Sequence, residues 1–285
     1  MRLSPASPAS CSGAERRIGE SAVTLVDLTR LLDPADLERM PDIARAGASV
    51  LVPDVSPIRP EAEGAEIMCA LFGCTREDLP DGEGWGDESL RISSHLGTHV
   101  DAPLHYGTTC EGRPSRTIDR IGLDELYCDG VVLDLRARCE PGRGIAVDAL
   151  RDAIAETGTT VGPGTAVLLR TGQERFGLAD PGFYSYPGMT RDGTLFLAEQ
   201  GAKVLGTDAV GWDRPFMAMR RAFEASGDRA EIWDGHFAGR DREVFIVQQL
   251  DNLAALPPSG FKVGFFPMKL AGCSAAPARV VAFVD

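Results

Sequence analysis

Three of the chain's four histidines lie within eleven residues, a tight cluster for a chain of 285 residues. His95, His99 and His105 combine with Asp101 into the pattern His-x-x-x-His-x-Asp-x-x-x-His. Neutral imidazoles and a carboxylate are ligands that suit zinc, manganese or iron(II). Structural zinc sites usually have four closed ligands, often cysteines, and no cysteine lies in this window. The pattern therefore indicates a catalytic metal site with an open position, rather than a structural site or a group of ordinary histidines.

The backbone of residues 95–105 is expected to be extended. A helix is opposed by a glycine, two β-branched residues and a proline: Gly97, Thr98, Val100 and Pro103. In an extended chain alternate side chains share a face, and the four polar side chains all occupy odd positions. They can then converge while the apolar side chains between them point into a core: Leu96, Val100 and Leu104.

The fourth histidine, His236, is a candidate to complete this site from another part of the chain. It stands in the sequence Trp-Asp-Gly-His-Phe at residues 233–237. Alone it would be a weak signal. It gains weight because the histidine segment offers three ligands and needs a further partner.

The amino-acid composition limits which kinds of protein and which partners this chain can have. An apolar content of 44% allows a sizeable core. A formal net charge of −13 without a basic block predicts neither a nucleic-acid partner nor an anionic membrane partner. Seven cysteines without a CxxC motif predict reduced thiols and a cytoplasmic location. Residues 1–22 lack the apolar stretch of a signal peptide and are expected to form a disordered leader.

Beyond the leader, strand-like and helix-like pieces alternate, which predicts one α/β domain over residues 23–285. Strands are expected at 23–28, 130–135, 165–170, 204–206, 244–247, 262–266 and 279–283. Helices are expected at 147–157, 190–202 and 217–225, with an interrupted helical piece at 34–47. Residues 53–89 are dense in Pro, Gly, Asp and Glu, and are predicted to form a long irregular lid.

The histidine segment resembles the putative cyclase family, which includes bacterial kynurenine formamidases and isatin hydrolases. The family signature His-x-Gly-Thr-His-x-Asp-x-Pro-x-His is matched without a gap over residues 95–105. Other stretches similar to the family lie at 26–29, 206–213, 252–257 and 266–275, so the resemblance covers roughly residues 23–285. It implies a single-domain fold of the swivelling β/β/α type with a mixed central sheet. It also implies a small-molecule substrate and a homodimer or homotetramer.

By this resemblance, His95, His99 and Asp101 bind a first metal, and His105 is the catalytic acid/base. His236 matches a histidine that binds a second metal together with a glutamate twelve residues later. That position is Gln248 here. A neutral amide binds a hard cation more weakly than a carboxylate, and two adjacent ions repel. We therefore expect one divalent ion, manganese or zinc, rather than two. Gln248 would then complete its shell through Oε1 or hydrogen-bond the substrate.

The predicted reaction is hydrolysis of an amide, lactam or lactone by metal-activated water, with His105 carrying the proton. One alternative is a cyclase or dehydratase that acts on a biosynthetic intermediate at the same metal site. Another is a non-catalytic binding protein, against which the open site argues. Thr98 and Trp212 are candidate substrate contacts. Further candidates for pocket walls are aromatic: Trp85, Phe176, Tyr184 and Tyr186.

Overall fold

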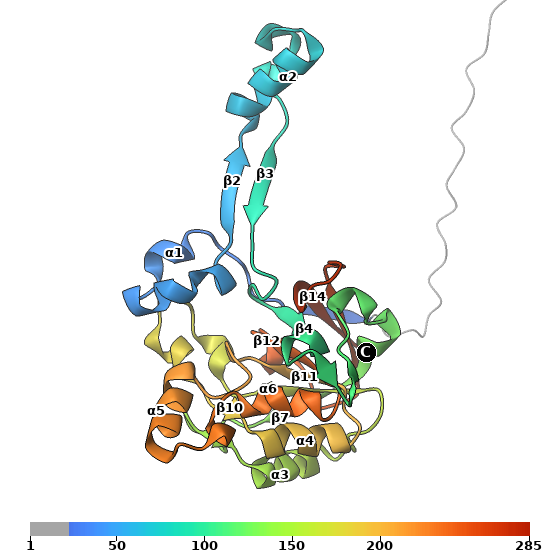
Figure 1. Cartoon of the computed structure of the whole chain (residues 1–285). Coiled ribbons are helices and arrows are strands. Elements are labelled where there is room, and N and C mark those ends of the chain that lie inside the picture. The colour runs from blue at the N-terminus through green and yellow to red at the C-terminus, as the bar shows by residue number, and fades with distance from the viewer. Residues whose placement is uncertain (1–22) are drawn as a thin grey trace, which may run out of the picture.

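A closed ring of strands forms the centre of the computed structural model, which describes residues 23–285 (Figure 1). The leader predicted at residues 1–22 lies outside the described residues. The strands follow the order β1-β14-β13-β7-β9-β11-β12-β4, and β4 also pairs with β14. Seven strands therefore close on themselves, and β1 extends the sheet beside β14. Their bounds are β1 (Thr24–Asp27), β4 (His99–Asp101), β7 (Tyr127–Asp134), β9 (Thr165–Arg170), β11 (Val204–Thr207), β12 (Phe245–Gln248), β13 (Phe261–Pro267) and β14 (Ala275–Val284).

The sheet is mixed, as predicted. Strands β7, β9, β11 and β12 run parallel, and β1, β4, β13 and β14 pair antiparallel with their neighbours. Parallel neighbours need crossover connections, and helices supply them. These are α3 (Val147–Thr157), α4 (Arg191–Glu199), α5 (Phe216–Ser226) and the short α6 (Asp234–Phe237). All four lie on one side of the ring (Figure 1).

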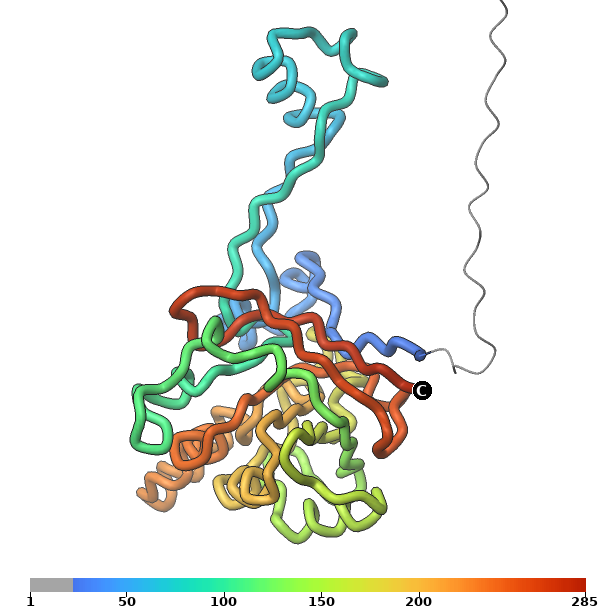
Figure 2. The backbone as a smooth tube through the Cα atoms, turned by 90° about the vertical axis from the view of Figure 1, so that its right-hand side faces the viewer, coloured from blue at the N-terminus to red at the C-terminus, as the bar shows by residue number. Residues whose placement is uncertain are grey.

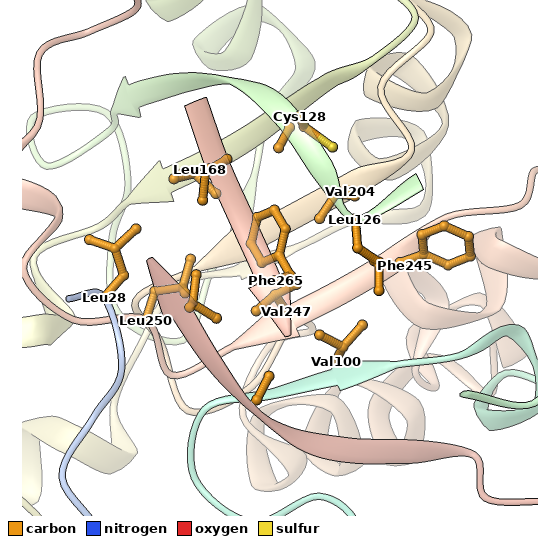
Figure 3. Packing of buried hydrophobic residues seen from close by; sticks show 14 of the residues in the cluster. Leu28, Val100, Leu126, Cys128, Leu168, Val204, Phe245, Val247, Leu250 and Phe265 are labelled. Carbon is orange, nitrogen blue, oxygen red and sulfur yellow. The ribbon is translucent and has the colours of Figure 1, made fainter. Parts of the chain in front are cut away.

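Side-chain alternation divides the apolar residues of the strands between two cores. In β9, Ala166 and Leu168 belong to the cluster inside the ring, whereas Val167 and Leu169 pack with the helices. Figure 3 shows side chains of the inner cluster gathered between the strands. Burial on both faces explains why these strands are continuously apolar in the sequence.

Helix ends follow local chemistry, and the predicted helices are confirmed within a few residues. The side chain of Thr190 accepts a hydrogen bond from the Gly193 amide and so caps α4. Gly158 ends α3 in the left-handed conformation, with φ of 66°. Pro41 separates α1 (Asp36–Arg39) from a 3-10 helix, η1 (Asp42–Val50), as expected for the interrupted helical piece.

Residues 54–91, here called the arm, form an ordered projection, so the prediction of an irregular lid is wrong. Two antiparallel strands, β2 (Asp54–Ile58) and β3 (Asp87–Arg91), lead to a helical tip with η2 (Pro60–Gly64) and α2 (Ala65–Phe72). The arm points away from the ring in two perpendicular views (Figures 1 and 2). Gly64 permits a close approach at the tip, because a Cβ there would lie 2.0 Å from the backbone oxygen of Trp85.

The remaining strands are pairs of two residues each: β5 (Thr109–Cys110) with β6 (Arg113–Pro114), and β8 (Gly144–Ile145) with β10 (Gly188–Met189). The six cysteines within residues 23–285 are free. No helix in the described part of the chain is long and apolar enough to span a membrane.

Arg116 ties three segments of the ring's periphery together, and its loss should destabilise the fold. Its guanidinium binds Glu125 at 2.7 and 2.9 Å and Glu243 at 2.9 and 2.7 Å. Arg116→Met would remove the main partner of both carboxylates and leave Lys203, 3.2 Å from Glu243 and 3.8 Å from Glu125, as their remaining cation, which we expect to cost about 1–3 kcal/mol of unfolding free energy. Urea unfolding measures this loss. Arg220→Met, which removes an exposed pair with Glu224, is the control and should leave the denaturation midpoint close to that of wild type.

The difference in stability between wild type and Arg116→Met should depend on pH. Hydrogen bonds from Arg116 lower the pKa of Glu125, and they also lower the pKa of Glu243 against the opposing effect of its burial. A lowered folded pKa gives stability that is present above the unfolded value of 4.5 and is lost as the pH falls through the folded pKa. The stability difference between wild type and Arg116→Met should therefore shrink below pH 4.5. A difference that stays constant down to acid unfolding would contradict this assignment.

Candidate metal centre

The histidine segment reaches the site by a strand between two turns, so the prediction that residues 95–105 are extended throughout is wrong. Only His99–Asp101 forms a strand, β4. Before it, Gly97 takes a left-handed φ of 58°, and a Cβ there would lie 2.5 Å from Leu32. After it, Pro103 begins a 3-10 helix, η5 (Pro103–His105), because its fixed φ suits a first helical position. His95 and His105 therefore enter the cluster through turns.

The structure brings His95, His99 and Asp101 together as three potential ligands. Their ligand atoms all lie within 4.8 Å of one another. Asp101 Oδ1 lies 2.8 Å from His95 Nδ1 and 3.3 Å from His99 Nε2. Although it is fully buried, Asp101 Oδ1 accepts no hydrogen bond of acceptable geometry. An unpaired buried carboxylate oxygen facing two ring nitrogens fits a shared divalent ion.

Outer contacts orient both imidazoles toward Asp101. His99 Nδ1 lies 2.7 Å from the Gly97 carbonyl oxygen, to which it must donate, so Nε2 carries the free lone pair. His95 Nε2 lies 3.3 Å from Ser274 Oγ, which leaves His95 Nδ1 to face Asp101. Partners of this kind fix the tautomer of a metal-ligating histidine.

A second trio, Asp101, His105 and His236, shares the same carboxylate. The rings of His105 and His95 lie 4.1 Å apart, and those of His105 and His236 lie 5.4 Å apart. Burial lowers the pKa of His105 to about 4, against the opposing charge of Asp101. His105 is therefore neutral at neutral pH and can accept a proton.

His236 is held by Asp213 and covered by Trp233, neither of which the sequence analysis assigned to the site. Asp213 contacts His236 Nδ1 and accepts hydrogen bonds from the amides of Gly235 at 2.6 Å and His236 at 3.2 Å. The Trp233 ring stacks on His236 at 4.4 Å with an interplanar angle of 18°. Burial opposes the charged form of His236, but Asp213 and Asp101 outweigh it and raise its pKa to about 9.

The carboxyl of Asp101 remains ionised despite its burial. Burial alone would raise its pKa, but His99, His105, His236 and His95 together hold the pKa well below its usual range. A buried charge is tolerated only where polar groups surround it, and the neighbouring imidazoles supply such groups.

Gln248 fills the space between the two trios. Strand pairing sets Gln248 opposite His99. Its Nε2 donates to Asp101 Oδ2 at 2.8 Å and lies 3.5 Å from His99 Nε2 and 3.4 Å from His236 Nε2. The amide nitrogen faces the carboxylate because an ionised carboxylate only accepts hydrogen bonds. Gln248 thus contacts Asp101 directly, and its role as a metal ligand or substrate contact stays a prediction.

The two predicted substrate contacts are not brought to the open part of the site. Thr98 Oγ1 donates to the Gln249 carbonyl oxygen at 2.6 Å and accepts from the Arg30 amide at 2.9 Å. Trp212 is fully buried, and its Nε1 donates to Thr194 Oγ1 at 3.0 Å. Both side chains are therefore occupied by structural contacts.

The other aromatic candidates are also placed elsewhere. Trp85 lies at the tip of the arm, and Phe176 and Tyr184 pack on a small separate cluster around Phe183. Tyr186 is buried. Aromatic side chains that do border the site are Tyr106, whose ring lies 5.9 Å from that of His105, and Trp233, whose ring lies 4.9 Å from it. For Trp233, its position three residues before His236 was the one signal available in the sequence.

Comparison with known proteins places the chain in a family. The family model described as "Putative cyclase" matches residues 26–214. The chain belongs to this family. A kynurenine formamidase from Salinibacter ruber is 29% identical over 195 residues, which cover 68% of this chain and 77% of the relative. An isatin hydrolase from Roseibium aggregatum is 26% identical over 284 residues, which cover 96% of each chain.

Solved structures confirm the predicted cyclase-family fold. The isatin hydrolase A from Ralstonia solanacearum has a TM-score of 0.69 at 23% identity, and the match covers 92% of each chain. Both relatives by sequence are named for hydrolytic activities, so the prediction of a hydrolase is confirmed at the level of the family. The individual site residues remain predictions, supported by the geometry above.

Asp213 should stabilise the segment that carries His236. Asp213→Asn replaces one accepting oxygen with an amide group that cannot accept from the donors it faces, so we expect a loss of about 1–3 kcal/mol in unfolding free energy. Urea unfolding measures it. Asp228→Asn, at the exposed cap of η10 (Arg229–Glu231), provides a matched control with a smaller loss. Equal denaturation midpoints for Asp213→Asn and wild type would contradict the supporting role of Asp213.

Proposed function

We propose that this chain is a hydrolase of small molecules that cleaves an amide, lactam or lactone, with one divalent ion at His95, His99 and Asp101. The observation that carries the proposal is that His95 and His99 both face Oδ1 of Asp101, a buried carboxylate oxygen that accepts no hydrogen bond. The hydrolytic names of the two relatives support the same reaction class.

The donor set suits manganese or zinc, because both accept imidazole nitrogen and carboxylate oxygen. A divalent ion held there would polarise a carbonyl group and lower the pKa of a water molecule to about 7. His95 and His99 would hold it through Nδ1 and Nε2, the nitrogens that face Asp101. The side chain of His95 is 20% exposed, so this ligand is in contact with solvent, whereas Asp101 is fully buried.

His105 is proposed as the acid/base. It lies beside His95 at the edge of the ligand trio, and its ring is neutral at neutral pH, the state in which a base accepts a proton. The same ring can then deliver this proton to the leaving nitrogen or oxygen. The Trp233 ring packs edge-on against that of His105 at an interplanar angle of 85°, so it contacts His105 as well as His236.

One ion rather than two is proposed because Gln248 and His236 already contact Oδ2 of Asp101, the oxygen that faces the second trio. Gln248 donates to Asp101 Oδ2, and His236 lies between the carboxylates of Asp101 and Asp213. A second divalent ion would have to displace the amide hydrogen bond without gaining a carboxylate ligand. Its affinity should therefore be much lower than that of the first.

The reaction is tested with N-formyl anilines, isatin-type lactams and aryl lactones, each assayed with manganese-loaded and zinc-loaded protein. Hydrolysis of these compounds releases one carboxylic acid and no strong base, so a pH-stat should record one proton per turnover. Loss of water without acid release would instead identify a dehydratase or cyclase.

The proposed ligand His99 and the proposed acid/base His105 should respond differently to substitution by alanine. His99→Ala should weaken the binding of the ion by at least about 100-fold, as loss of site residues usually does. His105→Ala should retain one bound ion per chain and lose about 10²–10⁴-fold in kcat. Calorimetric titration with Mn²⁺ and steady-state kinetics separate these effects. Full activity of His105→Ala on a true substrate would remove His105 from the mechanism.

Gln248→Glu should create a second ion site. The added carboxylate would bring negative charge to Asp101, His105 and His236, and we expect affinity for a second ion to rise at least about 10-fold. Metal analysis after equilibrium dialysis measures the stoichiometry. Gln200→Glu, an exposed glutamine at the end of α4, is the control and should leave it at one. Two tightly bound ions in the wild type, or an unchanged stoichiometry in Gln248→Glu, would contradict the single-ion proposal.

A further inference from the structure

Two cysteines flank the end of helix α2, which forms part of the tip of the arm (Figure 1). Cys69 lies in the last turn of α2, and Cys74 is the second residue after the helix. Both are half-buried free thiols. Neither belongs to the metal centre or to the three apolar clusters of the described residues. The site and the packing of the body therefore leave both thiols without a role.

The backbone at the end of α2 turns back on itself and brings the two cysteines together. Gly73, between them, takes a left-handed φ of 65°. The amides of Gly73 and Cys74 both donate to the carbonyl oxygen of Cys69, the Cys74 amide at 3.1 Å. In a helix end of this kind, the second residue after the glycine-bearing turn begins packs its side chain against the last turn of the helix. Both positions of that contact are cysteines here.

The geometry of this turn permits a disulfide. Backbone bond lengths and the hydrogen bond from the Cys74 amide to the Cys69 carbonyl limit the distance between the two Cα atoms to about 7 Å. A disulfide closes without backbone movement when its Cα atoms lie no more than about 7 Å apart. The thiols also contact each other: burial raises the pKa of the Cys74 thiol, and a hydrogen bond with the Cys69 thiol raises it further.

The other cysteines of residues 23–285 are held inside the body. Burial raises the pKa of Cys110, of Cys128 and of Cys139 to about 11 in each case. Because the thiolate is the reactive form of cysteine, these three thiols react slowly at neutral pH. Cys273 packs against the cluster inside the ring. The two cysteines at the arm tip are therefore the ones best placed to react with each other.

We propose that Cys69 and Cys74 are a reversible oxidation site, which forms a disulfide across the end of α2 on exposure to a small disulfide such as oxidised glutathione. One cysteine, as thiolate, attacks the small disulfide, breaks its sulfur–sulfur bond and releases one small thiol. The other cysteine then loses its proton, attacks the sulfur of the mixed disulfide and releases the second small thiol. The protein thus loses two hydrogen atoms, which reduce one small disulfide to two thiols. This inference does not depend on the reaction catalysed.

The first test is a peptide map of the full chain after treatment with oxidised glutathione, alkylation of the remaining thiols and digestion with chymotrypsin. This protease cleaves after Leu71 and Phe72, which separate the two cysteines. The fragments that carry Cys69 and Cys74 should stay joined until a reductant is added, and the intact chain should be lighter by two hydrogen atoms. Cys69→Ser should instead retain one glutathione on Cys74. Cys273→Ser is the control and should still form the link.

The second test asks whether the turn at Gly73 is what brings the thiols together. Gly73 and Gly227 each end a helix, with φ of 65° and 67°, and a Cβ at either position would meet no atom within 4 Å. Alanine therefore strains the backbone equally at both. Gly73→Ala should slow closure of the mixed disulfide at least about threefold, because an alanine disfavours the left-handed turn, whereas Gly227→Ala should not. Mass spectrometry of alkylated samples taken over time measures these rates.

A closed disulfide should also stabilise the end of α2. Hydrogen exchange at the Gly73 and Cys74 amides should slow at least about tenfold on oxidation of the wild type, and should stay unchanged in Cys69→Ser. Three results would overturn the proposal: separate glutathione adducts on Cys69 and Cys74 without a linked fragment, a link to a different cysteine, or equal closure rates in Gly73→Ala and Gly227→Ala.

Discussion

The buried carboxylate of Asp101 is the constraint on which the rest of this structure depends. It lies on β4, a strand of three residues that closes the ring by pairing with both β12 and β14. An ionised group in a fully buried closing strand is costly unless its charge is compensated. The surrounding imidazoles and the Gln248 amide provide that compensation, so closure of the fold and assembly of the site are one event.

The three residues of β4 also separate the apolar core from the polar site. Val100 points into the apolar interior of the ring, while His99 and Asp101 lie on the opposite face. This division was predictable from the sequence, because alternation in a strand depends only on backbone geometry. The residue types in the histidine segment likewise predicted which groups could bind a metal. Their convergence followed from the density of the cluster, even though most of the segment is not a strand.

The contributions that could not be predicted come from tertiary structure. Asp213 reaches His236 across 23 residues, and Trp233, whose backbone takes a left-handed φ of 54°, stacks on it. Trp212, which adjoins Asp213 in the sequence, points into the helix-side core instead. Trp212 and Asp213 are adjacent in the sequence but have different roles, and no local sequence pattern distinguishes them. The arm was missed for a related reason: its composition is typical of an irregular loop, and only the pairing of β2 with β3 orders it.

The origin of each site residue also determines how firmly it is held. His99 and Asp101 belong to β4, which pairs with a strand on each side, and Gln248 pairs with His99, so backbone pairing fixes the positions of all three. His95 and His105 stand outside β4, on turns, and both are only partly buried. His95 follows β3 by four residues, so the segment that carries it is continuous with the base of the arm. A rigid half and an adjustable half therefore meet at Asp101. Binding of an ion would therefore cost little conformational entropy at the strand residues. Most of the entropy loss would come from ordering His95 and His105, which lie on turns.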